Sequence, residues 1–198
     1  MPTIEGIEFS LFWDKDRDAL KSLSFPGRAE WLRERVEAVL LKPLDTLKSE
    51  PKTFVWLAAT ELVCAGIEAF AGFYGKRFCE FVHEFMHADF ANTAKNAKGK
   101  TWTYCQHLQE YFRNGLDHGF SIEWGGLWHD GENGMPGYLR PVSDSKGIAI
   151  DPLTFLDDFR KAVDAYFKKL TIDGENSITG KNFQKRFNAI LEHRSRTR

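Results

Sequence analysis

The chain has 198 residues, of which 42% are hydrophobic, 28% are charged and 14% are aromatic. This length is enough for one domain with a substantial core, and this composition excludes a chain that is disordered over most of its length. The formal net charge of −1 means that nothing in the overall charge requires a nucleic-acid partner.

Four helices are expected before residue 115, because apolar residues recur there at spacings of three and four. We place them at 28–41, 53–74, 76–94 and 101–114. Pro43 is expected to end the first helix. The polar run AKNAKGK predicts a flexible loop between the last two.

The second of these helices is the most apolar part of the chain. Residues 53–74 are apolar on nearly all sides of a helix, which predicts that the helix is buried on most sides. Glu61 and Glu68 lie inside it, and carboxylates are strongly disfavoured at the centre of a bilayer. No basic segment followed by an apolar one opens the sequence, so no signal peptide is expected. We therefore expect a soluble, cytoplasmic protein without a membrane partner.

Residues 120–150 have a different character, because glycine and proline are frequent there. The pairs Asp-Gly, Asn-Gly and Pro-Gly are turn signals, and they predict an inserted β-hairpin or small meander. Asp151 followed by Pro152 predicts the start of a helix over 153–170. A last helix is expected over 179–192.

We find no linker that would divide the chain, so we expect a single domain over 1–198. Its core would cover about 28–170, followed by a C-terminal helix and basic tail at 179–198. Six basic residues stand against one acid from position 181 onward. Such a tail can attract phosphate, or it can be a solvated terminus.

The three cysteines, Cys64, Cys79 and Cys105, have no C-x-x-C spacing. This count and spacing predict neither a disulfide framework nor a zinc knuckle. Cys64 and Cys79 lie in apolar helical patterns, where a cysteine usually packs as a small hydrophobic side chain.

The sequence His83-Glu84-Phe85-Met86-His87 matches the pattern H-E-x-x-H. On a helix, both imidazoles could reach one zinc ion while Glu84 activates water. The alternative is that His83 and His87 lie on the polar face of a helix whose Phe and Met residues pack inward. We expect no metal site and keep zinc as the minor alternative.

A cluster of polar residues lies at the end of the aromatic helix, at Arg113, Asn114, Asp117 and His118. The planar cation of arginine matches phosphate, and histidine transfers protons near neutral pH. Asn114 and His118 would share a face of a continuing helix. Arg113 and His118 are five positions apart, so they converge only if the helix ends or a second chain completes the site.

The pattern R-N-x-x-x-H within FRNGLDHGF resembles the signature of HEPN domains, which are small all-helical domains of prokaryotic defence and toxin–antitoxin systems and of some eukaryotic RNA-processing proteins. The segments ELVCAGIEAFAGFYG, FVHEFM and 148–166 resemble other helices of such proteins, so the similarity covers about 53–170. The resemblance implies an all-α fold, namely a HEPN-like up-down helical bundle carrying the inserted hairpin.

The resemblance further implies a metal-independent endoribonuclease without a cofactor, which acts as a homodimer with two R-x-x-x-x-H motifs facing each other across a cleft. RNA and a cognate antitoxin protein are the implied partners. His118 would assist proton transfer at the ribose 2′-hydroxyl or at the leaving oxygen. Arg113 would stabilise the phosphorane charge, and Asn114 would orient His118 or the phosphate.

Three acids would support this cluster. An acid inside an apolar helix needs a partner, so we expect Glu61 or Glu68 to pair with Arg113. Asp117 is next to His118 in the sequence and adds a negative charge there. The alternative function is a non-catalytic HEPN-like module that binds nucleic acid or protein.

Overall fold

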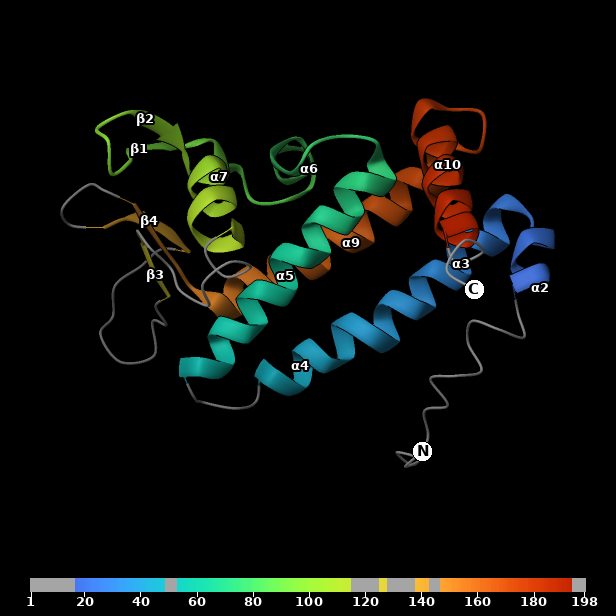
Figure 1. Cartoon of the computed structure of the whole chain (residues 1–198), viewed down its shortest axis with the longest axis horizontal. Helices are drawn as coiled ribbons and strands as arrows, with labels where there is room; N and C mark the ends of the chain where they lie inside the picture. The colour runs from blue at the N-terminus through green and yellow to red at the C-terminus, as the bar shows by residue number, and fades with distance from the viewer. Residues whose placement is uncertain (1–16, 49–52, 115–124, 128–137, 143–146, 194–198) are drawn as a thin grey trace.

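The computed structural model describes residues 17–48, 53–114, 125–127, 138–142 and 147–193. The protein is mostly helical with two small sheets (Figure 1), which confirms the predicted predominance of helix. The helical segments are α2 (Arg17–Ser22), α3 (Phe25–Val36), the π-helix η1 (Glu37–Leu41), α4 (Lys42–Lys48), α5 (Thr53–Tyr74), α6 (Phe78–Phe85), the 3₁₀-helix η2 (Ala88–Ala91), α7 (Tyr104–His107), the π-helix η3 (Leu108–Arg113), α9 (Pro152–Asp173) and α10 (Ile178–His193). The strands are β1 (Thr93–Lys95), β2 (Thr101–Thr103), β3 (Gly125–Leu127), β4 (Leu139–Pro141) and β5 (Ile148–Ile150).

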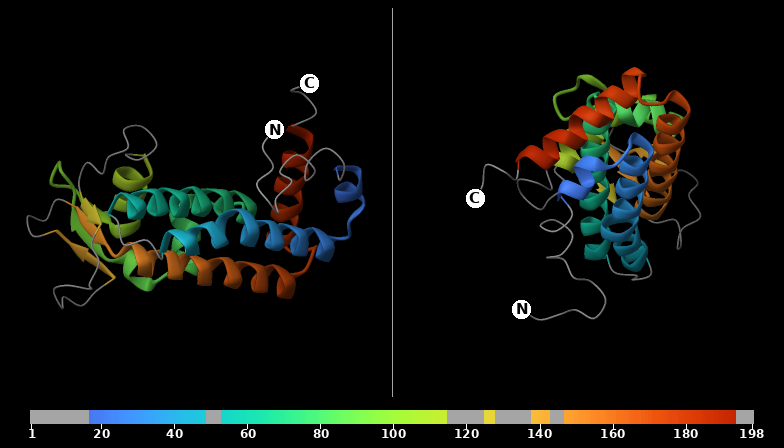
Figure 2. Two further views of the ribbon diagram at one scale, coloured as in Figure 1. Left: turned by 90° about the horizontal axis from the view of Figure 1, so that it is seen from below. Right: turned by 90° about the vertical axis from the view of Figure 1, so that its right-hand side faces the viewer.

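Three long helical rods lie side by side, with α10 across one end and the strands at the opposite end (Figure 2). The rods are α3–η1–α4, α5 and α9. Arg33 pairs with Asp164 and Glu37 pairs with Arg160, so the first rod runs antiparallel to α9. The shorter α7–η3 segment comes between α5 and α9 in the sequence and packs against α5 through η3.

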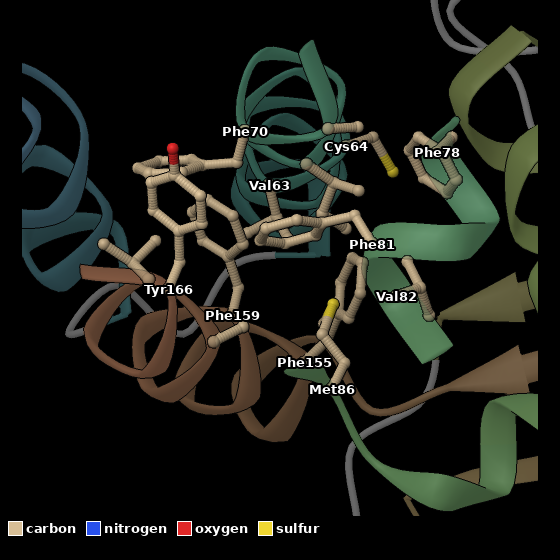
Figure 3. Packing of buried hydrophobic residues seen from close by; sticks show 14 of the residues in the cluster. Val63, Cys64, Phe70, Phe78, Phe81, Val82, Met86, Phe155, Phe159 and Tyr166 are labelled. Carbon is tan, nitrogen blue, oxygen red and sulfur yellow. The ribbon is translucent and has the colours of Figure 1, made fainter. Parts of the chain in front are cut away.

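Helix α5 supplies the centre of the core. Its Phe70 ring lies 6.0 Å from the ring of Phe81, 6.2 Å from that of Phe159 and 5.4 Å from that of Tyr166. Figure 3 shows these rings meeting between α5, α6 and α9. By length and composition alone, Val55–Tyr74 could cross a membrane, but 44% of its most apolar stretch is buried inside the protein. The helix packs against α4, α6, α9, α10 and η3, which fits the core helix of a soluble protein.

The predicted end of the first helix at Pro43 is wrong. Helix α3 begins at Phe25, where Ser24 caps it, and the rod continues through η1 into α4. In η1 the backbone N–H of Lys42 donates to the carbonyl of Glu37, five residues back. Pro43 has no N–H to donate, and the widened π turn lets the helix pass a residue that would normally break it.

A second hairpin replaces parts of two predicted helices. Helix α6 ends at Phe85 rather than near residue 94, and strands β1 and β2 pair antiparallel at 93–95 and 101–103. The predicted loop forms their turn, where the Asn96 side chain accepts the backbone N–H groups of Lys98 and Lys100. Gly99 takes φ +75°, a conformation that favours glycine.

The hairpin predicted within 120–150 is confirmed for β4 and β5, which pair antiparallel, and β3 adds a parallel strand beside β5. The Tyr138 hydroxyl donates to Asp158 of α9 at 3.1 Å, and burial raises the pKa of this phenol. Asp151 caps α9 as predicted, since its side chain accepts the N–H groups of Leu153 and Thr154.

The expectation of no disulfide is wrong. Cys79, the second residue of α6, is bonded to Cys105 of α7. The hairpin β1–β2 lies between them in the sequence, and its return brings α7 back against α6. Cys64 takes no part in this disulfide and is buried in the core, as expected. The prediction failed because the spacing of the two cysteines carries no signal until the hairpin is known.

His107 is fully buried next to the β1–β2 hairpin, and its ring lies 5.6 Å from each of the rings of Trp102 and Tyr111. Its Nε2 lies 3.3 Å from the carbonyl oxygen of Ala94. Its Nδ1 has no hydrogen-bond partner among the described residues. Burial lowers the pKa of this imidazole, and the Ala94 contact opposes the shift only in part.

We expect the free energy of unfolding to fall as the pH drops below about 6.5, the ordinary pKa of histidine. Below that pH the histidine in the unfolded chain takes up a proton, whereas folded His107 does so only near its lowered pKa. The stability that this difference contributes at higher pH is therefore lost progressively as the pH falls toward the folded pKa. The loss cannot exceed about 1.4 kcal/mol per pH unit. Urea unfolding at pH 7.5 and 5.5 should show a smaller difference in His107→Gln than in the wild type. His83→Gln, which removes an exposed histidine, should keep the full difference, and equal effects of the two variants would contradict the assignment.

Gly66 of α5 packs directly against Phe159 of α9 and Leu40 of η1. A Cβ at this position would lie 2.5 Å from Cζ of Phe159 and 3.1 Å from Cδ2 of Leu40. Gly66→Ala should therefore destabilise the protein by about 1–3 kcal/mol in chemical unfolding. The matched control is Gly72→Ala on the same helix, where the nearest atom is Nε of the flexible Arg186 side chain at 3.3 Å. There the better helix propensity of alanine should leave stability unchanged or raise it. A similar loss in both variants would refute the packing argument.

Candidate functional site

Arg113 is the last residue of η3, and its side chain faces α5. Its Nε lies 3.8 Å from Oε2 of Glu68, which confirms the prediction that an acid of the apolar helix pairs with Arg113. Its Nη1 donates to Oδ1 of Asn114 at 2.8 Å, and Nδ2 of Asn114 donates to Oε2 of Glu110 at 3.1 Å. A connected set of side chains therefore fixes the guanidinium at the end of the helix.

The arginine borders a small hollow of about 150 Å³ on the surface of α5. Glu61 and Glu68 both line it, together with Cys64 and Ala65. The two supporting acids predicted on α5 thus line the same hollow as Arg113, and Glu68 makes the contact described above. The arginine side chain is 32% exposed and that of Glu68 is 51% exposed, so solvent reaches the pair.

The π-helical form of η3 sets the direction of Arg113. The N–H of Asn114 donates to the carbonyl of Gln109, five residues back, so this turn holds one residue more than an α-turn. Tyr111 and Phe112 are both buried in this wide turn. Arg113, the residue that follows them, therefore lies beside α5. Two adjacent buried aromatics are the only sequence signal of this geometry.

The side chain of Asn114, which is predicted to orient His118 or the phosphate, contacts two neighbouring side chains. Its carbonyl oxygen is engaged by Arg113 and its amide by Glu110, so the side chain orients the arginine and the neighbouring acid. His118 and Asp117 lie outside the described residues. The predicted convergence of Arg113 with His118 is therefore a matter for experiment.

The carboxylates around Arg113 restrict which ligands the site can bind. Glu61 and Glu68 line its hollow, and Glu110 is linked to it through Asn114. A planar guanidinium binds phosphate with two parallel hydrogen bonds, and such a contact would take the place of the Glu68 contact. An anionic ligand at this site must therefore compete with a carboxylate.

The H-E-x-x-H segment does not have the helical arrangement that zinc binding needs. Helix α6 ends at Phe85, so His87 leaves the helix face that carries His83. Nδ1 of His87 accepts the backbone N–H of Asp89 at 3.2 Å, and Glu84 pairs with Lys169 at 3.8 Å. Within the described ranges, no group of three His, Cys, Asp or Glu side chains could hold a metal ion.

A larger groove of about 820 Å³ continues from the hollow, sharing Ala65 and Glu68 with it. It is bounded by α5, α6, α7 and the α10 residue Arg186. Sequence reasoning did not identify this groove. The basic character of the C-terminal helix was the one signal, but it could not show that Arg186 lies against α5.

Comparison with family models, with curated proteins and with solved structures finds no significant match. The relation to HEPN domains stays a prediction from the R-N-x-x-x-H motif and its sequence context.

We expect the effects of Glu68→Gln and Arg113→Gln on the free energy of unfolding to be coupled. Because the pair is partly exposed, a double-mutant cycle on urea unfolding should give about 0.2–1 kcal/mol, decreasing with added salt. Glu80→Gln is the matched control, since Glu80 of α6 pairs with Arg77, the residue that precedes this helix. Its effect should add independently to that of Arg113→Gln. Coupling that is absent, or insensitive to salt, would contradict the ion pair.

Proposed function

We propose that this chain is a HEPN-like protein that cleaves RNA without a metal ion, with Arg113 and His118 as its reacting groups. The observation that carries the proposal is the fixed position of Arg113. Glu68 and Asn114 hold it at the end of a helix, beside a solvent-open hollow. A pre-oriented cation of this kind stabilises charge that develops on a phosphate without reorganising first.

The reaction would use the RNA itself as the nucleophile. The ribose 2′-hydroxyl attacks the adjacent phosphorus, its proton passes to a base, and the 5′-oxygen of the next nucleotide leaves with a proton. His118 would serve at one of these two proton transfers. Arg113 would stabilise the extra negative charge on the phosphorane, and Asn114 would keep the guanidinium in place.

A second copy of the chain would supply the other half of the site. One chain carries one arginine and one histidine of the motif, whereas cleavage has two proton transfers. The exposed side of α5 next to Arg113 carries Leu62, Ala65 and Ala69, which would allow close approach of a second subunit. We include in the proposal a homodimeric, cytoplasmic protein of a toxin–antitoxin or defence system, regulated by an antitoxin.

The second candidate function is a non-catalytic HEPN-like module that binds protein or nucleic acid. The observation that favours it is the number of carboxylates near the single arginine. Glu61 and Glu68 share its hollow, and each opposes the approach of a phosphate. A basic protein segment would meet no such opposition.

Incubation of the purified protein with structured RNA in the presence of a chelator tests the proposal. We expect cleavage to products with 2′,3′-cyclic phosphate and 5′-hydroxyl ends. Arg113→Ala should lower the rate by about 10²–10³-fold, as loss of a transition-state charge partner does. His118→Ala should also abolish cleavage, and Arg113→Lys should not restore it because the planar fork is lost.

The matched control is Arg33→Ala. This substitution removes an arginine of α3 that pairs with Asp164 of α9 and does not line the hollow, so it should leave cleavage unchanged. Absence of cleavage by the wild type, or cleavage that survives His118→Ala, would reject the ribonuclease. RNA binding without cleavage, measured by fluorescence anisotropy and weakened by Arg113→Ala, would support the binding module instead.

A further inference from the structure

The larger groove beside the candidate site is lined in part by Cys79, one of the two cysteines of the Cys79–Cys105 disulfide. Cys79 lines the groove and is partly exposed, whereas Cys105 is completely buried. A disulfide is cleaved only when a thiolate reaches one of its sulfurs. The groove therefore gives access to the bond from one side, at Cys79.

The lining of this groove suits a small anionic molecule. Lys76, Arg77 and Arg186 contribute three positive charges, against the two carboxylates of Glu68 and Glu80. Glu80 is engaged by Lys76 at 3.6 Å and by Arg77 at 3.1 Å. The amides of Gln106 and Gln109 add neutral hydrogen-bonding groups on the wall formed by α7 and η3.

Arg186 is the cation available to a ligand. Within the described part of the chain it makes no ion pair, and its guanidinium lies across Gly72 of α5. A Cβ at Gly72 would be 3.3 Å from Nε and 3.7 Å from Cζ of Arg186, so the absence of a side chain makes room for the guanidinium. The guanidinium thus lies at the groove, and no described residue accepts a hydrogen bond from it.

We propose that this groove is a site of thiol–disulfide exchange, at which an anionic low-molecular-weight thiol binds and reversibly opens the Cys79–Cys105 bond. The site is separate from the ribonuclease proposal, because it uses neither Arg113 nor His118. Disulfides inside cells are commonly transient or redox-sensing, and such bonds are accessible to small thiols.

The exchange proceeds in two steps that balance. The thiolate of the ligand attacks Sγ of Cys79, the bond to Sγ of Cys105 breaks, and Cys105 leaves as a thiolate that takes a proton. Cys79 now carries the ligand as a mixed disulfide. A second ligand thiolate attacks the ligand sulfur and releases Cys79 as a thiol. The protein gains two electrons and two protons, and two ligand thiols become one ligand disulfide.

The state of the cysteines is the first measurement. The aerobically purified protein should be denatured without reductant, alkylated and analysed by mass spectrometry. One alkylated cysteine, Cys64, is expected. Three alkylated cysteines would overturn the proposal, because no bond would then be present to exchange.

The rate of exchange is the second measurement, with glutathione as the anionic thiol and 2-mercaptoethanol as the neutral one. Arg186→Ala should slow reduction by glutathione about two- to fivefold at low salt and leave reduction by 2-mercaptoethanol unchanged. Arg33→Ala, which removes the same charge outside the groove, should change neither rate. Equal slowing of both thiols by Arg186→Ala, or no slowing of either, would overturn the proposal.

The attacked sulfur is identified by two matched variants treated with oxidised glutathione. Cys105→Ala leaves the groove-lining thiol and should form a glutathione adduct on Cys79 within the native protein. Cys79→Ala leaves the buried thiol and should form none until it is unfolded. An adduct on Cys105 in the native protein, or none on Cys79, would show that the groove is not the route of attack. Circular dichroism of both variants checks that they are folded.

Discussion

The need to cover α5 determines most of this structure. A helix that is apolar on nearly all sides must be surrounded, and α4, α6, α9, α10 and η3 each bury part of it. At Gly66 the Phe159 ring occupies the space that a side chain would need. The open side of α5 includes Ala65 and Glu68, which line both the hollow and the groove.

The two π-helices solve different problems with the same device. In η1 the extra residue lets a helix pass Pro43, so one continuous rod can run along α9. In η3 it buries two successive aromatics and leaves Arg113 beside the acids of α5. In each case the tertiary contacts that the π-turn permits outweigh the free-energy cost of losing regular α-helical hydrogen bonds.

The parts of the fold that were predictable are those fixed by local chemistry. The apolar run of α5 and the Asp151-Pro152 start of α9 determine their own structure, and Glu68 was expected to pair because an acid in an apolar helix needs a partner. The parts that were not predictable depend on contacts distant in sequence. Asn96 and Gly99 shape a turn whose strands are only three residues long, too short for periodicity to reveal. The disulfide depends on that turn, because the turn returns α7 to α6. The position of Arg186 depends on the packing of α10 against α5.

The bond between Cys79 and Cys105 encloses a covalent loop with a sequence separation of 26, which contains η2 and the β1–β2 hairpin. Closing a loop of this length restricts the unfolded chain by about 3–4 kcal/mol on the chain-entropy estimate. A difference of that size changes the unfolded population by roughly 10²- to 10³-fold. Since proteases in the cell remove proteins largely through their unfolded forms, the oxidation state of one bond would set how long each molecule survives.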